Sequence, residues 1–184
     1  MRIKNSMINL IVSWTTQILN IILQFALRTI FINLLSTEYL GLNGLFSNIL
    51  SFLSFAELGF GSAITFSLYK PLAEKNEKTV ASIMNFFKKV YTGVGIFVLG
   101  IGSALTPFLP YLINEMPDIP HIYFIYILWV FNSGISYFFV YKSTLIIADQ
   151  RKDIVDKNNI VFKILQLMLQ AVILFFTRNY ILYL

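Results

Sequence analysis

The stretch from Asn5 to Leu27 reads NSMINLIVSWTTQILNIILQFAL, which is 23 residues without a formal charge. A transmembrane helix needs about 20 predominantly apolar residues, because the hydrocarbon core of a bilayer is about 30 Å thick. The stretch is too long for the core of a secretory signal and lacks a small-residue cleavage site. It therefore predicts a retained membrane-spanning helix, over about residues 7–34 with its apolar flanks.

The composition of the whole chain is that of a membrane protein. Of its 184 residues, 57% are hydrophobic and 12% charged, and the mean hydropathy is +0.73. Soluble domains carry roughly 25% charged residues, so this chain lacks the surface that a soluble globular domain needs. The absence of cysteine from the sequence excludes disulfides, Cys-ligated zinc and thiol catalysis.

Four further charge-poor stretches predict helices, since a charged side chain at the bilayer centre costs roughly 2.5 to 3.5 kcal/mol. Two of these stretches carry one internal charge each, Glu57 in the first and Lys163 near the start of the last. The fold class predicted is therefore all-α, a polytopic transmembrane bundle within a single domain over residues 1–184. About five spans are expected, at residues 7–34, 41–67, 90–112, 121–147 and 159–182, with a cytoplasmic loop at 69–89.

The distribution of Lys and Arg predicts the orientation. The loops 36–40 and 110–120 contain neither residue. The cations of the other flanks lie on the opposite side: Arg2, Lys4, Lys70, Lys75, Lys78, Lys88, Lys89, Arg151, Lys152 and Lys157. The positive-inside rule then places the N-terminus in the cytoplasm. This asymmetry also accounts for the net charge of +5 without nucleic acid, for which the sequence has no motif.

Polar residues form a stripe along each of three predicted spans. At 100° per residue, the stripe covers about 80° of span 7–34, about 120° of span 41–67 and about 60° of span 159–182. The members are Ser13, Gln17, Asn20, Gln24 and Arg28; Asn43, Ser47, Ser51, Ser54, Glu57, Gly61 and Thr65; and Asn159, Lys163, Gln166, Gln170 and Thr177. Such residues either bond neighbouring helices, at roughly 0.6 kcal/mol each, or line a hydrophilic cavity of the kind that a polar solute requires.

Three charged residues inside the spans are candidates for that cavity. Glu57 is the deepest, and it is either functional or ion-paired, or a protonated carboxyl that hydrogen-bonds locally. Arg28 suits an anionic phosphate, because a guanidinium stays charged and forks onto phosphate oxygens, although an interfacial arginine can also reach lipid headgroups. Lys142 lies near a cytoplasmic helix end, where the same two roles are open.

Enzyme signatures are absent from the sequence. It contains one histidine, and no Gly-rich phosphate loop, HExxH motif, paired carboxylates or Ser/His/Asp set can be assembled. We therefore expect no enzymatic activity, no metal and no cofactor.

Several segments resemble the N-terminal part of bacterial polysaccharide flippases of the Wzx type, in the multidrug/oligosaccharidyl-lipid/polysaccharide exporter superfamily. The segments are YLGLNGLFSNILSFLSFAELGFGSAITFSLYKPLAE at 39–74, FFKKVY at 86–91, SYFFVYKSTLIIADQRK at 136–152 and TRNYILYL at 177–184. AELGFGSA and YKSTLIIADQ are the most specific of them.

This resemblance implies a fold of two pseudo-symmetric, MATE-like lobes in the bacterial cytoplasmic membrane. It implies transport of an undecaprenyl-diphosphate-linked oligosaccharide from the cytoplasmic to the outer leaflet, with a polysaccharide polymerase and glycosyltransferases as possible partners. Family members use cations in the central cavity, and the matching positions are Arg28 and Lys142. Glu57 matches the acidic position that precedes Leu-Gly.

Five spans amount to an incomplete first lobe, whereas alternating access needs two halves. We therefore expect a truncated reading frame or a piece of a longer chain. The alternatives are a membrane-embedded assembly or scaffold subunit, a multidrug exporter of the same superfamily and, more distantly, a polyprenyl-phosphate glycosyltransferase. The candidate cavity residues are Arg28, Gln24, Asn20, Gln17, Glu57, Ser54, Lys142, Gln166 and Gln170.

Overall fold

The computed structural model describes residues 2–54, 60–113, 117 and 119–184. Helices make up nearly all of this described part and no strand occurs in it, which confirms the predicted all-α class. The chain divides into two compact units, each of which we describe by itself. The terminal unit comprises residues 1–37 and 146–184, and the central unit comprises residues 38–145.

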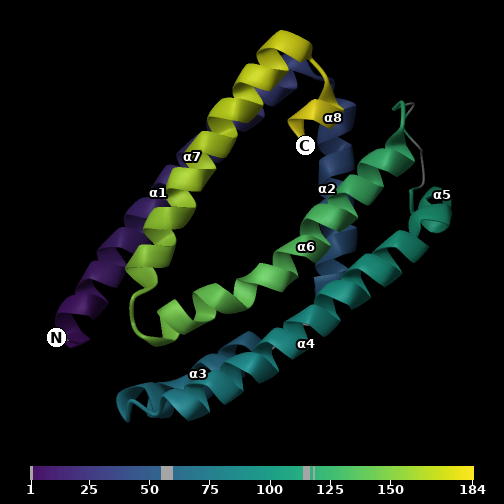
Figure 1. Cartoon of the computed structure of the whole chain (residues 1–184). Coiled ribbons are helices and arrows are strands. Elements are labelled where there is room, and N and C mark those ends of the chain that lie inside the picture. Colours follow the sequence, from purple (N-terminus) through teal and green to yellow (C-terminus); the bar gives the residue numbers. More distant parts are fainter. Residues whose placement is uncertain (1, 55–59, 114–116, 118) are drawn as a thin grey trace. The chain divides into compact units, whose positions relative to one another are not determined.

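Two long helices form the terminal unit, α1 (Arg2–Leu34) and α7 (Lys152–Thr177). They lie side by side (Figure 1). Asn9, near the start of α1, contacts Gln150 and Asp153 at the start of α7. Phe31, near the end of α1, packs edge-on against Tyr180 of the short helix α8 (Tyr180–Tyr183), which follows α7. The two helices are therefore parallel.

The contact between α1 and α7 is a seam of the coiled-coil type. The least exposed positions repeat at spacings of three and four residues, as in a heptad pattern. They include Asn9, Ser13, Thr16, Asn20, Leu23, Leu27 and Phe31 on α1, and Asp153, Asp156, Ile160, Lys163, Leu167, Gln170 and Leu174 on α7. Away from the seam, large apolar side chains are exposed, such as Trp14 at 72% and Phe176 at 79%. Surfaces of this kind suit contact with lipid.

At its start, the seam is polar and internally satisfied. The Asp153 side chain is buried, and its oxygens accept from Arg151 Nε at 3.3 Å and Lys157 Nζ at 3.2 Å. Ser13 Oγ donates to Asp156 Oδ2 at 2.5 Å. Arg151 and Lys157, which the sequence marks as topology signals, therefore also neutralise a buried carboxylate.

The central unit contains α2 (Thr37–Ser54), α3 (Phe60–Ala73), α4 (Glu77–Ala104), the short turns η2 (Thr106–Phe108) and α5 (Leu109–Leu112), and α6 (Ile122–Ala148). A few terminal residues of α2 and α6 are grouped with the other unit. Its core is formed by apolar and aromatic side chains, and α3 folds back along α4 (Figure 1). The fully buried members include Phe46, Leu68, Phe87, Val98, Tyr126 and Val130.

Four helices are long and apolar enough to cross a membrane: α1 over residues 9–34, α4, α6 and α7. They identify the chain as a membrane protein. The predicted span 41–67 instead comprises α2, of 18 residues, and α3, of 14 residues, on either side of residues 55–59. Those five residues, Glu57 among them, lie outside the described part of the chain.

The predicted loop at 69–89 is largely helical. Helix α3 continues through Pro71 to Ala73, and α4 begins at Glu77. Asn76 caps α4, because its side-chain oxygen accepts from Thr79 N at 3.1 Å, and Glu77 places a negative charge in the first turn. The polar residues of this segment therefore lie at the end of α3 and in the first turns of α4.

Candidate functional site

A polar cavity lies between α2 and α6, within the central unit. It measures about 400 Å³, and we call it the serine cavity. Its lining consists of Ser47, Leu50, Ser51 and Ser54 of α2 with Trp129, Asn132, Ser133 and Ser136 of α6. Five hydroxyls and one amide therefore surround the space, and none of these lining residues is charged.

The cavity lies at the middle of an apolar helix. Helix α6 spans Ile122–Ala148, and its 27 residues place Asn132, Ser133 and Ser136 within a turn of its centre. Polar side chains at that depth face protein or a water-filled space, since lipid tails offer no hydrogen bonds. On α2 the three serines are spaced by four and three residues, which puts them on one face. The two polar faces meet at the cavity.

Three of the serine hydroxyls donate to their own helices. Ser51 Oγ donates to the Ser47 carbonyl, Ser54 Oγ to the Ser51 carbonyl and Ser136 Oγ to the Ser133 carbonyl, each at 2.7 Å. A hydroxyl has one donor proton and two lone pairs, so each of these oxygens can still accept hydrogen bonds. The wall of the cavity is therefore rich in acceptors, and the Asn132 amide can supply donors.

An aromatic cluster adjoins the cavity. The Phe46 ring lies edge-on to Tyr126, with centroids 5.1 Å apart, and to Trp129 at 6.5 Å. Edge-to-face packing at these distances fixes ring orientation. Trp129 thus contributes both to the core of the central unit and to the cavity wall.

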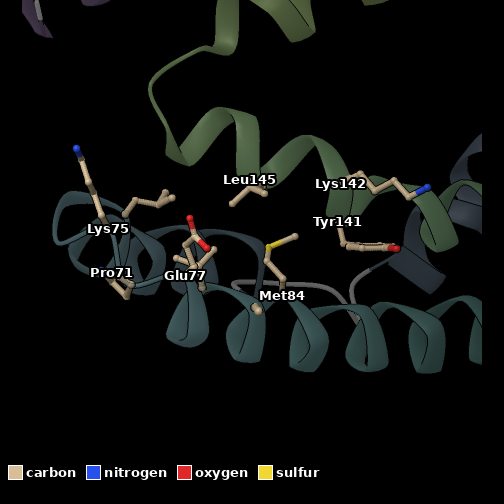
Figure 2. Close-up of a pocket in the computed structure, with 10 residues that line it drawn as sticks. Pro71, Lys75, Glu77, Met84, Tyr141, Lys142 and Leu145 are labelled. Carbon is tan, nitrogen blue, oxygen red and sulfur yellow. The ribbon is translucent and has the colours of Figure 1, made fainter.

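A second pocket of about 640 Å³ lies between the α3–α4 turn and the end of α6. Figure 2 shows Met84 of α4 and Leu145 of α6 pointing into the gap from opposite sides, with Lys75 and Glu77 at the turn. Lys142 lines this pocket, and its Nζ lies 5.6 Å from the centre of the Phe139 ring on the same helix. The pocket is mainly apolar, with charges at its edge.

A basic hollow of about 440 Å³ lies on α4. Asn85, Lys88, Lys89 and Thr92 line it, and their spacing places them on one helix face. Within the described residues, no cluster of three or more His, Cys, Asp or Glu side chains forms a metal site.

The predicted site residues fall in both units. In the terminal unit, Gln17, Gln24 and Arg28 are exposed on α1, whereas Asn20 is half-buried in the seam. The predicted stripe on α1 is therefore split, because α7 covers one edge of it. The positions of these residues relative to a substrate stay a prediction.

The remaining candidate residues lie in different parts of the structure. Gln166 is exposed and accepts from Lys163 Nζ at 3.5 Å, and Gln170 donates to the Tyr183 carbonyl at 3.2 Å. Ser54 lines the serine cavity and Lys142 lines the second pocket. Glu57 lies outside the described residues. The structure thus brings Ser54 together with polar groups of α6 that the sequence did not single out.

Those missed residues are Asn132, Ser133 and Ser136. A search for continuous polar stripes overlooks them, because the helix is aromatic and aliphatic before and after them. The available signal is their position: three polar residues within five, at the centre of a 27-residue apolar helix.

Comparison of the chain with protein-family models, curated proteins and solved structures gave no match. The flippase family therefore stays a prediction from the sequence resemblance.

Proposed function

We propose that this chain is part of a transporter that moves undecaprenyl-diphosphate-linked oligosaccharide units from the cytoplasmic to the outer leaflet of the bacterial cytoplasmic membrane. The main support is the serine cavity, a space lined by five hydroxyls and an amide beside the centre of an apolar helix. A polar headgroup cannot cross hydrocarbon without such a substitute for water. The polyprenyl tail needs no cavity, because it stays soluble in the lipid.

The diphosphate of such a substrate needs a cation. Arg28 is exposed on α1, outside the seam with α7, and is therefore accessible to a ligand or to a further part of the transporter. Its guanidinium keeps its charge and can donate two parallel hydrogen bonds to phosphate oxygens. We assign Arg28 to the diphosphate, with the exposed amides of Gln17 and Gln24 along the same side of α1.

This function also sets the orientation and the partners of the protein. The N-terminus lies in the cytoplasm, where glycosyltransferases complete the lipid-linked unit, and a polysaccharide polymerase consumes that unit on the outer side. These two partners follow from the chemistry of the pathway alone. The glycosyltransferases must supply the substrate, and the polymerase must remove the product.

A rescue assay in a flippase-deficient strain tests this proposal. The chain is expressed alone and joined to a second lobe, and surface polysaccharide is measured for the parent, Arg28→Ala and Arg28→Lys. We expect surface polysaccharide to fall at least about tenfold in the Arg28→Ala variant, because a charge-assisted contact is lost. The Arg28→Lys variant should keep most of the parent level. Lys78→Ala, which alters an exposed cation at the start of α4, is the matched control.

Two results would contradict the proposal. One is the absence of rescue by any form, although each is inserted in the membrane. The other is equal rescue by Arg28→Ala and the parent, which would reduce Arg28 to a headgroup anchor.

A scaffold role is the second candidate, and the α1–α7 seam favours it. Ser13, in the polar stripe of α1, donates to Asp156 of α7, and Asn9, one turn earlier, accepts from Asp153 N of the same helix. Part of the predicted polarity therefore serves helix association alone. A scaffold would tolerate changes in the serine cavity that a transporter would not.

A further inference from the structure

We propose that the serine cavity is a subsite for an uncharged saccharide, which holds a sugar ring and excludes the diphosphate. The assignment of this sugar to a lipid-linked substrate rests on the proposed function, whereas the binding chemistry rests on the cavity alone.

The lining of the cavity favours an uncharged ligand over an anion. The eight lining residues include no Lys, Arg or His. The hydroxyls of Ser51, Ser54 and Ser136 already donate hydrogen bonds to backbone carbonyls. Their oxygens are therefore left to act as acceptors toward a ligand. A phosphate oxygen is itself an acceptor and would find no cation and few donors here. A sugar hydroxyl can donate to each of these oxygens and accept from the Asn132 amide.

The size of the cavity agrees with a sugar. Its volume of about 400 Å³ lies near the lower end of the usual range of small-molecule pockets, about 300 to 1,000 Å³. Such a volume suits one or two rings and is far too large for a bare cation. A pyranose ring combines hydroxyl edges with an apolar C–H face, and the Trp129 indole offers an aromatic surface beside the hydroxyls.

A buried polar group lies on the same face of α6, outside the cavity. Tyr126 is 0% exposed, and its hydroxyl makes no hydrogen bond within the described residues. Tyr126 lies one turn before Trp129 and within about 20° of Ser133 around the helix. A buried hydroxyl without a partner is costly. Tyr126 does not line the serine cavity, so this hydroxyl belongs to the core of the central unit and makes no contact with a ligand in the cavity.

The two tryptophans of the chain provide a direct assay. Trp14 is 72% exposed on α1, so Trp14→Phe leaves Trp129 as the sole indole at little structural cost. The protein is placed in phosphatidylcholine nanodiscs, which avoids maltoside detergents, and is titrated with maltose, sodium pyrophosphate and sodium chloride. We expect a saturable change in Trp129 fluorescence with maltose, and no saturable change with either salt.

Serine variants then locate the binding. Ser51→Ala, Ser54→Ala and Ser136→Ala each remove one acceptor from the cavity. We expect each to raise the half-saturating maltose concentration about fivefold, the effect of one net hydrogen bond. Ser143→Ala is the matched control, because Ser143 is on α6 and donates to the Val140 carbonyl at 2.8 Å in the same way, yet lies outside the cavity.

The outcomes separate this inference from the proposed function. Saturable maltose binding that the cavity variants weaken and Ser143→Ala does not would support the subsite, even if no form rescues transport. A missing maltose signal would overturn the subsite, and so would an equal signal with pyrophosphate or sodium, or an equal effect of Ser143→Ala. Rescue by Ser51→Ala and Ser136→Ala at the parent level, without sugar binding, would overturn the subsite and leave transport standing.

Discussion

Asn9 makes two hydrogen bonds that join α1 to the start of α7. Its Nδ2 donates to the Gln150 carbonyl at 2.9 Å, and its Oδ1 accepts from Asp153 N at 2.9 Å. The first N–H groups of a helix have no partner within the helix, so Asn9 acts as a cap supplied by a distant part of the chain. Asp153, which it contacts, is buried.

We therefore predict that Asn9→Ala destabilises the protein by about 1 to 3 kcal/mol, the cost of leaving a buried backbone donor unpaired. Thermal unfolding in detergent micelles measures this change. Asn33→Ala is the control, because Asn33 is exposed on the same helix, and its effect should stay within about 0.5 kcal/mol. Equal melting temperatures for the two variants would show that the Asn9 bonds contribute nothing.

The sequence predicted least well which neighbours surround each polar side chain. Ser13, Gln17, Asn20 and Gln24 share one face of α1. Only the partner helix decides that Ser13 and Asn20 enter the seam while the two glutamines stay outside it. A periodicity defines a face, but it does not say what covers that face.

At the scale of helices, the glycines of α4 show the same limit. Gly93, Gly95, Gly100 and Gly102 all lie on this helix, and the sequence alone does not tell which of them another helix contacts. In the structure, a Cβ added to Gly102 would lie 2.8 Å from Val130 Cγ1 of α6. A Cβ added to Gly93 or Gly100 would have no such atom within 4 Å. Gly134 on α6 is equally confined, since its Cβ would lie 2.5 Å from Leu99 Cγ.

We predict that Gly102→Leu and Gly134→Leu each destabilise the central unit by about 1 to 3 kcal/mol, because the added atoms overpack the α4–α6 contact. Gly93→Leu and Gly100→Leu should be neutral or stabilising by up to about 1 kcal/mol, since glycine is a poor helix former. Denaturant titration of the purified variants separates the two pairs. Loss of stability in all four would assign the glycines to helix bending and not to packing.

At the scale of the whole molecule, the existence and the type of the elements were predictable, because long apolar runs allow little else in a bilayer. The sequence predicted about five spans, whereas four of the described helices meet the length and hydropathy of a span. The parallel arrangement of α1 and α7 bears on this difference. Two parallel spans cross the membrane in the same direction, so the chain between them must cross it an odd number of times.

Helices α4 and α6 have the length and hydropathy for two of those crossings. The segment 37–73, which contains α2 and α3, must therefore supply the third, although neither helix by itself meets both the length and the hydropathy of a span. We predict five crossings, with Ser36 and Tyr111 on the outer side and Lys75 and Gln150 on the cytoplasmic side. The side itself follows from the Lys and Arg distribution.

The sequence contains no cysteine, so single cysteines at these four positions test the prediction directly. A membrane-impermeant maleimide applied to intact spheroplasts should label Ser36→Cys and Tyr111→Cys, and should label Lys75→Cys and Gln150→Cys only after permeabilisation. The unmodified chain is the blank. Labelling of Ser36→Cys and Lys75→Cys from the same side would mean that segment 37–73 does not cross. In that case α1 and α7 could not both span the membrane as parallel neighbours, because the chain would reach Lys152 on the wrong side of it.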